Sequence, residues 1–125
     1  MQECPVTISI DVKKRRIRLY KSMLGLLEKP DFVQILINIK KKEIAVLGVK
    51  KSLDAHRIRY NARNCCELYS KPLVEKICMY FPEMKQETYQ LSGVVSEEAR
   101  VAVFSMSTLE QVEGGELCGK DGVQN

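Results

Sequence analysis

Residues 32–49 read FVQILINIKKKEIAVLGV, and this stretch decides the fold. Val33, Ile35, Ile37 and Ile39 stand at alternate positions, which is the period of a strand with one buried face. Three consecutive lysines, residues 40–42, then form a charged turn that also discourages pairing between sheet edges. Residues 43–49 return as the second arm. The stretch therefore predicts a β-hairpin whose apolar face needs a cover.

The residues before this hairpin complete a small unit. Two short segments alternate apolar and polar side chains, and an apolar-faced helical segment follows them. Pro30 ends that helix because proline cannot continue its hydrogen-bond ladder. The unit then has the order β-β-α-β-β. Its expected elements are strands at 6–10 and 17–19 around a charged turn at 11–16, a helix at 21–29, and the hairpin.

The same order of elements returns in the second half. Leu68-Tyr69 precedes the second apolar-faced segment 49 positions after Leu19-Tyr20 precedes the first, and Pro82 stops the second helix. We interpret this order as an internal duplication. The expected elements are strands at 57–60 and 65–68, a helix at 71–81, and strands at 88–95 and 100–106.

One unit of about 45 residues exposes too much apolar surface to be stable alone. We therefore expect an α+β fold in which two tandem repeats, approximately 5–51 and 55–112, form a single domain over residues 1–112. The two repeats form either a pseudo-twofold β-barrel with short helices, which removes exposed strand edges, or a saddle of side-by-side repeats like the TATA-binding fold. The glycine-rich residues 113–125 predict a flexible tail.

Two stretches carry a family resemblance. Residues 8–19, ISIDVKKRRIRL, and residues 24–35, LGLLEKPDFVQI, resemble the AbrB/SpoVT swapped-hairpin units, and MraZ proteins carry two such units in tandem. Asp11 and Arg15 match the Asp-x-x-x-Arg motif of MraZ by spacing, whereas Lys14 stands where the family usually has glycine. The resemblance implies a swapped-hairpin barrel that binds DNA through the region of Lys13 to Arg18 and, in the second unit, of Arg57 to Arg63.

Composition narrows the function. The chain has 125 residues and a net charge of +4, but residues 1–63 carry 15 Lys+Arg against 6 Asp+Glu. Residues 64–125 carry 5 against 10. This split favours a polyanion-binding face or two complementary associating faces. The chain has neither a run of about 20 apolar residues nor a recognisable signal peptide, so we expect a cytoplasmic protein without membrane contact.

No motif of an enzyme is apparent. The sequence has no CxxC pair, no phosphate-binding glycine loop and a single histidine, His56, so we expect no catalytic residue, no metal and no cofactor. The five cysteines are expected to be reduced thiols, with a redox role for the adjacent Cys65 and Cys66 left open. Tyr20, Tyr60 and Tyr69 either stack on bases or pack against the helices.

The basic residues around the predicted turns are the candidate binding site. In a hairpin turn they would project from the end of the sheet, and pseudo-symmetry would bring the two groups to one face, where clustered cations suit phosphate contacts. The candidate nucleic-acid-binding residues are Lys13, Lys14, Arg15, Arg16, Arg18, Lys21, Arg57, Arg59 and Arg63.

Three functions follow from these features. The first is a non-enzymatic regulatory or accessory protein that clamps the phosphates of duplex DNA with two basic turns. The second is a protein-interaction module, antitoxin-like or an assembly factor, whose basic half binds an acidic partner or the acidic half of another copy. The third, a small-molecule-binding barrel or enzyme, has the least support in the sequence.

Overall fold

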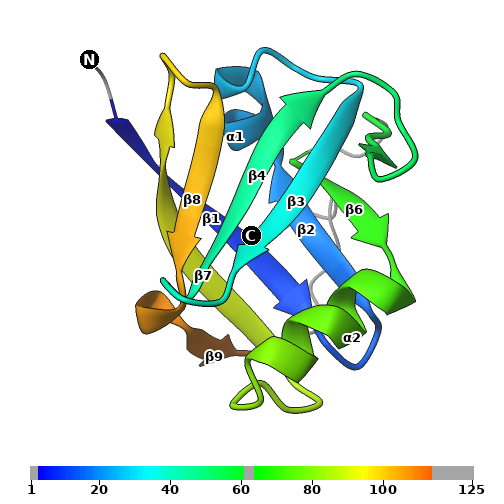
Figure 1. The fold of residues 1–125 in the computed structure, drawn as a ribbon, viewed down its shortest axis with the longest axis vertical. Helices are drawn as coiled ribbons and strands as arrows, with labels where there is room; N and C mark the ends of the chain where they lie inside the picture. Colours follow the sequence, from blue (N-terminus) through cyan, green and yellow to red (C-terminus); the bar gives the residue numbers. More distant parts are fainter. Residues whose placement is uncertain (1–2, 61–63, 114–125) are drawn as a thin grey trace.

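A computed structural model describes residues 3–60 and 64–113 as a nearly closed β-barrel with two short helices (Figure 1). Of the two arrangements that the sequence left open, the barrel is confirmed. Its elements are β1 (Glu3–Asp11), β2 (Arg16–Tyr20), α1 (Lys21–Leu26), β3 (Phe32–Asn38), β4 (Glu43–Val49), β5 (His56–Arg57), β6 (Cys65–Tyr69), α2 (Lys71–Tyr80), β7 (Thr88–Ser96), β8 (Val101–Ser105), a 3-10 helix (Met106–Thr108) and β9 (Glu110–Val112).

All described strands belong to one sheet of order β5-β3-β4-β8-β7-β1-β2-β6, and β9 pairs with β7 beside this path. Every pairing is antiparallel. The two hairpins β3–β4 and β7–β8 lie next to each other because β4 pairs with β8. The order ends at β5 and β3 on one side and at β6 on the other, so the barrel has a seam between these strands.

Some boundaries differ from the predicted ones. The first helix ends at Leu26, and Glu28 and Lys29 take positive φ angles of 69° and 48° that end it before Pro30. The strand expected at 57–60 is reduced to the two residues of β5. The 3-10 helix and β9 were not predicted. The tail expected at 113–125 lies, except for Glu113, outside the described residues.

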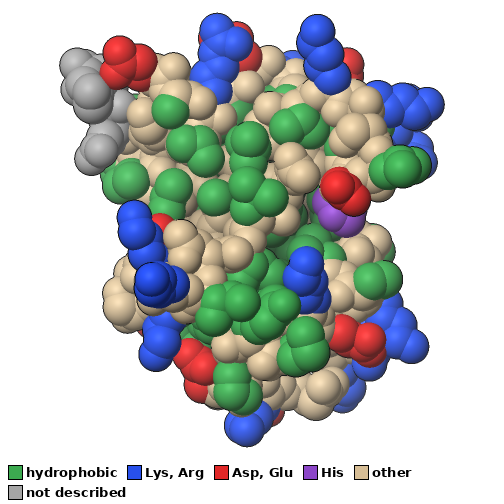
Figure 2. Space-filling model, in the orientation of Figure 1, with side chains coloured by type: hydrophobic (Ala, Val, Ile, Leu, Met, Phe, Trp, Pro, Cys, Tyr) green, Lys and Arg blue, Asp and Glu red, His purple; other side chains and the backbone are tan. Residues whose placement is uncertain are grey.

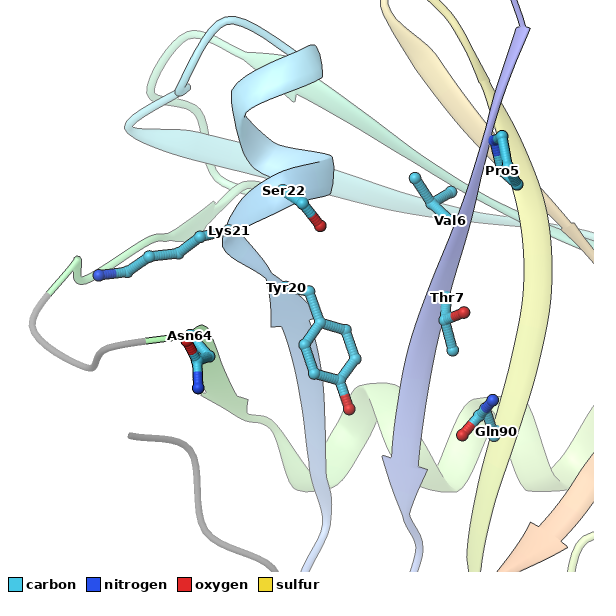
Figure 3. A pocket seen from close by; sticks show the side chains of 8 residues that line it. All are labelled: Pro5, Val6, Thr7, Tyr20, Lys21, Ser22, Asn64 and Gln90. Atoms are coloured by element: carbon cyan, nitrogen blue, oxygen red, sulfur yellow. The ribbon is translucent and has the colours of Figure 1, made fainter. Parts of the chain in front are cut away.

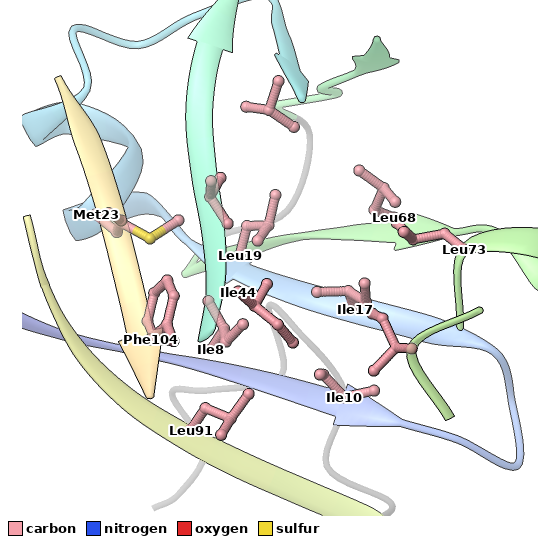
Figure 4. Packing of buried hydrophobic residues seen from close by; sticks show 14 of the residues in the cluster. Ile8, Ile10, Ile17, Leu19, Met23, Ile44, Leu68, Leu73, Leu91 and Phe104 are labelled. Carbon is pink, nitrogen blue, oxygen red and sulfur yellow. The ribbon is translucent and has the colours of Figure 1, made fainter. Parts of the chain in front are cut away.

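The barrel interior is one apolar cluster. Alternate residues of the strands point into it, and Figure 4 shows Ile8, Ile10, Ile17, Leu19 and Phe104 converging from β1, β2 and β8. Val33 of β3 is fully buried there, as its alternation predicted, while Ile35 and Ile37 pack against the cluster but are only partly buried. Ile39 does not share that face, because it lies in the hairpin turn and is half exposed.

Three hairpin turns share one local design. A polar side chain, from Asp11, Asn38 or Ser96, accepts a hydrogen bond from the backbone N–H three residues later, at 3.1, 3.0 and 3.3 Å. One residue further on, Arg15, Lys42 and Arg100 have positive φ angles of 53°, 56° and 57°. This left-handed conformation disfavours side chains with a Cβ, and the polar cap at the start of each turn compensates.

Candidate functional site

The outer face of β7, β1, β2 and β6 is polar. Side chains alternate across each strand, so the neighbours of Ile10, Ile17 and Leu68 face outward. The registers place these outward residues in rows across the four strands. One row is Thr88, Asp11, Arg16 and Tyr69, and the next is Gln90, Ser9, Arg18 and Glu67. Two arginines thereby stand between two carboxylates.

The two arginines are buried in this face, with only 1% of Arg16 and 8% of Arg18 exposed. An Nη1 atom of Arg16 lies 3.1 Å from Glu67 Oε2, and its Nη2 lies 3.3 Å from Asp11 Oδ2. Arg18 Nε donates to the same Glu67 oxygen at 3.3 Å. The prediction that Arg16 projects from the turn is therefore wrong, because Arg16 lies in β2 and pairs with Asp11 and Glu67. Arg18 lies in the predicted strand, but its side chain is held by Glu67.

This charged network is only partly satisfied. Arg16 Nε and Nη2 and Arg18 Nη2 are buried without a hydrogen bond, although Nη2 of Arg16 is within ion-pair distance of Asp11. Burial lowers the pKa of Arg16, but the hydrogen bond to Tyr69 and the charges of Glu67 and Asp11 outweigh it and raise the pKa above its usual value. Arg16 therefore stays charged, and the network is structural rather than free to contact phosphates.

The other predicted basic residues are not gathered on one face. Lys13 and Lys14 are exposed in the β1–β2 turn, and half-exposed Arg15 pairs with Glu75 of α2 at 3.3 Å. Arg57 and Arg59 are exposed in and after β5, which lies away from that turn in Figure 1. Lys21 begins α1 and is partly buried, and Arg63 lies outside the described residues.

A hollow of about 590 Å³ with a mixed polar and apolar lining lies at the other end of this outer face (Figure 3). Thr7, Tyr20 and Gln90 line it from neighbouring strands, and Lys21, Ser22 and Asn64 line its other side. The Tyr20 hydroxyl is within 3.1 Å of Ser9 Oγ, so the ring is held in the wall of the hollow. The hollow offers hydroxyl and amide groups and one lysine. Sequence reasoning missed it because its residues come from four separate stretches of the chain.

The front of the molecule has a different character. In Figure 2, apolar side chains cover the sheet surface in the upper half and the helix below it, and a hollow separates the two. This hollow is a groove of about 520 Å³ between β3 and α2, and we call it the seam groove. Its lining includes Gln34, Ile35 and Leu36 from β3, Leu53, Asp54 and His56 from the β4–β5 region, and Ser70, Pro72, Leu73 and Lys76 from the α2 segment.

Several large apolar side chains on this front are exposed. Leu36 is 46% exposed, Ile39 50% and Leu53 fully exposed. Leu36 and Ile39 also line a second hollow, which Val103 of β8 helps to form. Neighbouring exposed apolar side chains are uncommon on a protein that works alone and typically mark a contact surface. The alternation in residues 32–39 predicted the buried side of β3 but gave no sign of this surface.

His56 is half-buried at one end of the seam groove, and burial lowers its pKa below 6.5. An unfolded chain then binds the imidazole proton more readily than the folded one. We expect the His56 contribution to stability to be unchanged above about pH 6.5 and to decline as the pH falls from there toward the lower folded-state pKa. Urea unfolding at pH 7.5 and 5.5 should show a larger acid-induced loss in the native chain than in His56→Gln. Equal losses would contradict the shift.

The cysteines are not all reduced thiols as expected. Cys65 is disulfide-bonded, whereas Cys4, Cys66 and Cys78 are free. Burial raises the pKa of Cys66, which makes its thiol a poor nucleophile at neutral pH. A redox centre that needs Cys65 and Cys66 as a reactive pair of thiols is therefore not what the structure shows.

The remaining aromatic candidates are held in place by the fold. The Tyr60 hydroxyl donates to the carbonyl of Pro30, and Lys29 lies 5.2 Å from the centre of the Tyr60 ring. Burial, with smaller effects of Cys66 and Asp31, raises the pKa of Tyr60 to about 12. Tyr69 is 64% exposed, but its hydroxyl donates to Glu67 at 3.1 Å. Of the three tyrosines, Tyr69 is the most exposed, while Tyr20 lines the hollow and Tyr60 is partly buried.

Within residues 3–60 and 64–113, no three His, Cys, Asp or Glu side chains are arranged to hold a metal ion. Neither of the helices described there is long and apolar enough to cross a membrane. Comparison with family models, with curated proteins and with solved structures finds no match for this chain.

Proposed function

We propose that this chain is a protein-interaction module and that its partner binds at the apolar front formed by β3, β4 and β8 and the seam groove. The observation that carries the proposal is the contiguous exposure of Leu36, Ile39 and Leu53 around two hollows. Covering these side chains would remove apolar surface from water, at roughly 25 cal/mol per Å². The other exposed large apolar side chains, Tyr69, Met79 and Val94, line neither of these two hollows.

The charges around the front favour an acidic partner. Lys40, Lys41 and Lys42 are exposed at the end of β3, and Lys76 lines the seam groove. No ion pair joins these lysines to another residue in the described part of the chain. Complementary charge speeds association and selects partners more than it adds affinity. We therefore assign the basic half of the chain to recognition of a partner that presents apolar and acidic side chains together.

Binding of duplex DNA is the second candidate. Lys13 and Lys14 favour it, because they are exposed and have no ion-pair partner among the described residues, and the resemblance to swapped-hairpin DNA-binding proteins suggested it. The burial of Arg16 and Arg18 counts against it, because they are the centre of the basic run and their charges are already neutralised by Asp11 and Glu67. The remaining candidate cations in the described residues are scattered over the β1–β2 turn, α1 and the β5 region, so they do not form one clamp.

We also propose that the barrel arose from two repeated β-β-α-β-β units. The β2–β6 register is symmetric about Arg18 and Glu67, which are 49 positions apart, like the two Leu-Tyr pairs. The β4–β8 register is symmetric about Ala45 and Val103, 58 positions apart. The same 58 positions separate the left-handed residues Lys42 and Arg100 of the two hairpin turns. Such paired symmetry is what a pseudo-twofold duplication would leave.

One experiment separates the two functions. Twelve-residue peptides selected from a random library against the folded protein are measured by fluorescence anisotropy, alongside a 20-base-pair duplex at about 50 and 200 mM salt. We expect peptide binding that Leu36→Glu weakens at least tenfold and that Lys13→Ala with Lys14→Ala leaves unchanged. DNA binding that falls roughly a thousandfold between the two salts and is lost in the lysine variant would instead establish the DNA function. Failure of every selected peptide to depend on Leu36 would overturn the front as the binding surface.

A further inference from the structure

β3 has a free edge on the side of the seam groove. On one side, β4 pairs with the full length of β3, from Phe32 to Asn38. On the other side, β5 pairs only with Phe32 and Val33. No strand in the described part of the chain pairs with residues 34–38 on that side. Backbone N–H and C=O groups that point outward there lack a partner in the sheet, and such an edge is a template for another strand.

The opposite wall of the groove is a helix. α2 follows β6 directly and presents Pro72, Leu73 and Lys76 toward β3 across a space of about 520 Å³. Ser70 caps this helix by accepting a hydrogen bond from the Leu73 N–H at 3.3 Å, which fixes where the wall begins. A strand edge facing a helix across an open groove is the arrangement in which several peptide-binding domains accept an extended segment.

The barrel itself is incomplete at this place. Ile35 and Ile37 face the interior and pack against the core, yet both remain only partly buried. Val33, which pairs with His56 of β5, is fully buried. A strand beside residues 34–38 would cover these two isoleucines. It would also occupy the gap in the sheet order between β3 and β6.

We infer that the partner contributes an extended segment that adds a strand to the edge of β3 in the seam groove, a mode that rests on the proposed function. On its inner face the segment carries apolar side chains that cover Ile35, Ile37 and Leu73. On its outer face it carries an apolar side chain beside Leu36 and acidic side chains near Lys76 and near the lysines at residues 40–42. Five residues of edge correspond to about 17 Å of strand, so main-chain hydrogen bonds provide the affinity and the groove provides the selectivity.

The test uses the tightest selected peptide and two N-methylated analogues. Amide groups of a strand alternate between its two edges, so methyl groups on alternate residues block either the edge that faces β3 or the other edge. We expect the analogue methylated on the edge that faces β3 to bind at least tenfold more weakly than the unmethylated peptide. The analogue methylated on the other edge should bind within about twofold of the unmethylated peptide. Hydrogen exchange should show new protection at alternate amides of residues 34–38 when the unmethylated peptide is bound.

A pair of charge variants tests the groove. Lys76→Glu should weaken the peptide at least fivefold, whereas Lys85→Glu, an exposed lysine that does not line the groove, should not change its affinity. If the two methylated analogues bind equally well and the amides of residues 34–38 gain no protection from hydrogen exchange, strand addition is wrong, even if Leu36→Glu abolishes binding. If binding is insensitive to Leu36→Glu as well, the proposed function fails with it.

Discussion

Replacing Gly93 with alanine should destabilise the protein more than the same change at the other two glycines in the described residues. Gly93 lies in β7 opposite Phe104, and a Cβ built on it would come within 2.1 Å of the Val103 carbonyl oxygen and 2.7 Å of Phe104 Cδ2. Real Cβ atoms do not approach backbone oxygens so closely, and neither neighbour can give way easily. The Val103 oxygen belongs to the β8 backbone, and Phe104 is fully buried in the core. We expect Gly93→Ala to cost about 3 kcal/mol.

Urea unfolding followed by circular dichroism measures this loss. At an m value of about 1.5 kcal/mol/M, the expected midpoint falls by roughly 2 M. Gly25→Ala is the matched control, because a Cβ at Gly25 in α1 meets nothing within 4 Å. Alanine favours the helix by about 0.5–1 kcal/mol over glycine, so this variant should be more stable than the native chain. Similar midpoints for the two variants would show that the β7–β8 approach is not tight.

The second large effect is expected for Arg16→Met, which keeps most of the side-chain volume and removes the charge. Asp11 is 6% exposed and the Glu67 side chain 18%, and both carboxylates face Arg16. The variant leaves Arg18 as the one cation contacting Glu67 and leaves Asp11 without its ion-pair partner. Removing one member of a buried ion pair typically costs 3–5 kcal/mol because the other charge stays buried. We expect a loss in that range, or failure to fold.

Arg15→Met provides the comparison one residue away. Arg15 and Glu75 are 40% and 52% exposed, and exposed ion pairs contribute between nothing and about 1 kcal/mol. The double change Arg16→Met with Asp11→Asn should recover part of the stability that Arg16→Met loses, because it removes the stranded Asp11 carboxylate and leaves Glu67 paired with Arg18. If the single variant were no less stable than Arg15→Met, Arg16 would not hold the network together, and its side chain would be available for other contacts.

Most strands of this fold could be predicted from local patterns. The alternation in residues 32–39 and 43–49 gave β3 and β4 nearly to the residue, because a strand with one buried face repeats every two positions. Proline and the apolar spacing gave α2 to within one residue. β5 was overestimated because its length depends on contact with β3, and only Phe32 and Val33 provide that contact.

The candidate site could not be predicted in the same way. Residues 17–19, Ile-Arg-Leu, alternate like a strand, which placed Arg18 opposite the core but left Arg16 in the predicted turn. Their burial depends on Glu67, about 50 positions away, and no local pattern reports that pairing. A run of basic residues therefore appeared as one surface, when its members divide between an exposed turn and a buried network. The seam groove likewise depends on the position of β3 relative to α2, and no local sequence pattern reports that position.

The Arg18–Glu67 pair has a consequence for the history of the chain. If the barrel descends from two identical units, the symmetry of the β2–β6 register makes residues 18 and 67 the same ancestral position. In a dimer of identical units, that residue would have faced its own copy across the twofold axis, so a charged side chain there would have met a like charge. Fusion into one chain would release this constraint and allow arginine on one side and glutamate on the other. Glu67→Arg would place like charges at this position, and a complementary salt bridge on the axis is a feature that two identical units cannot encode.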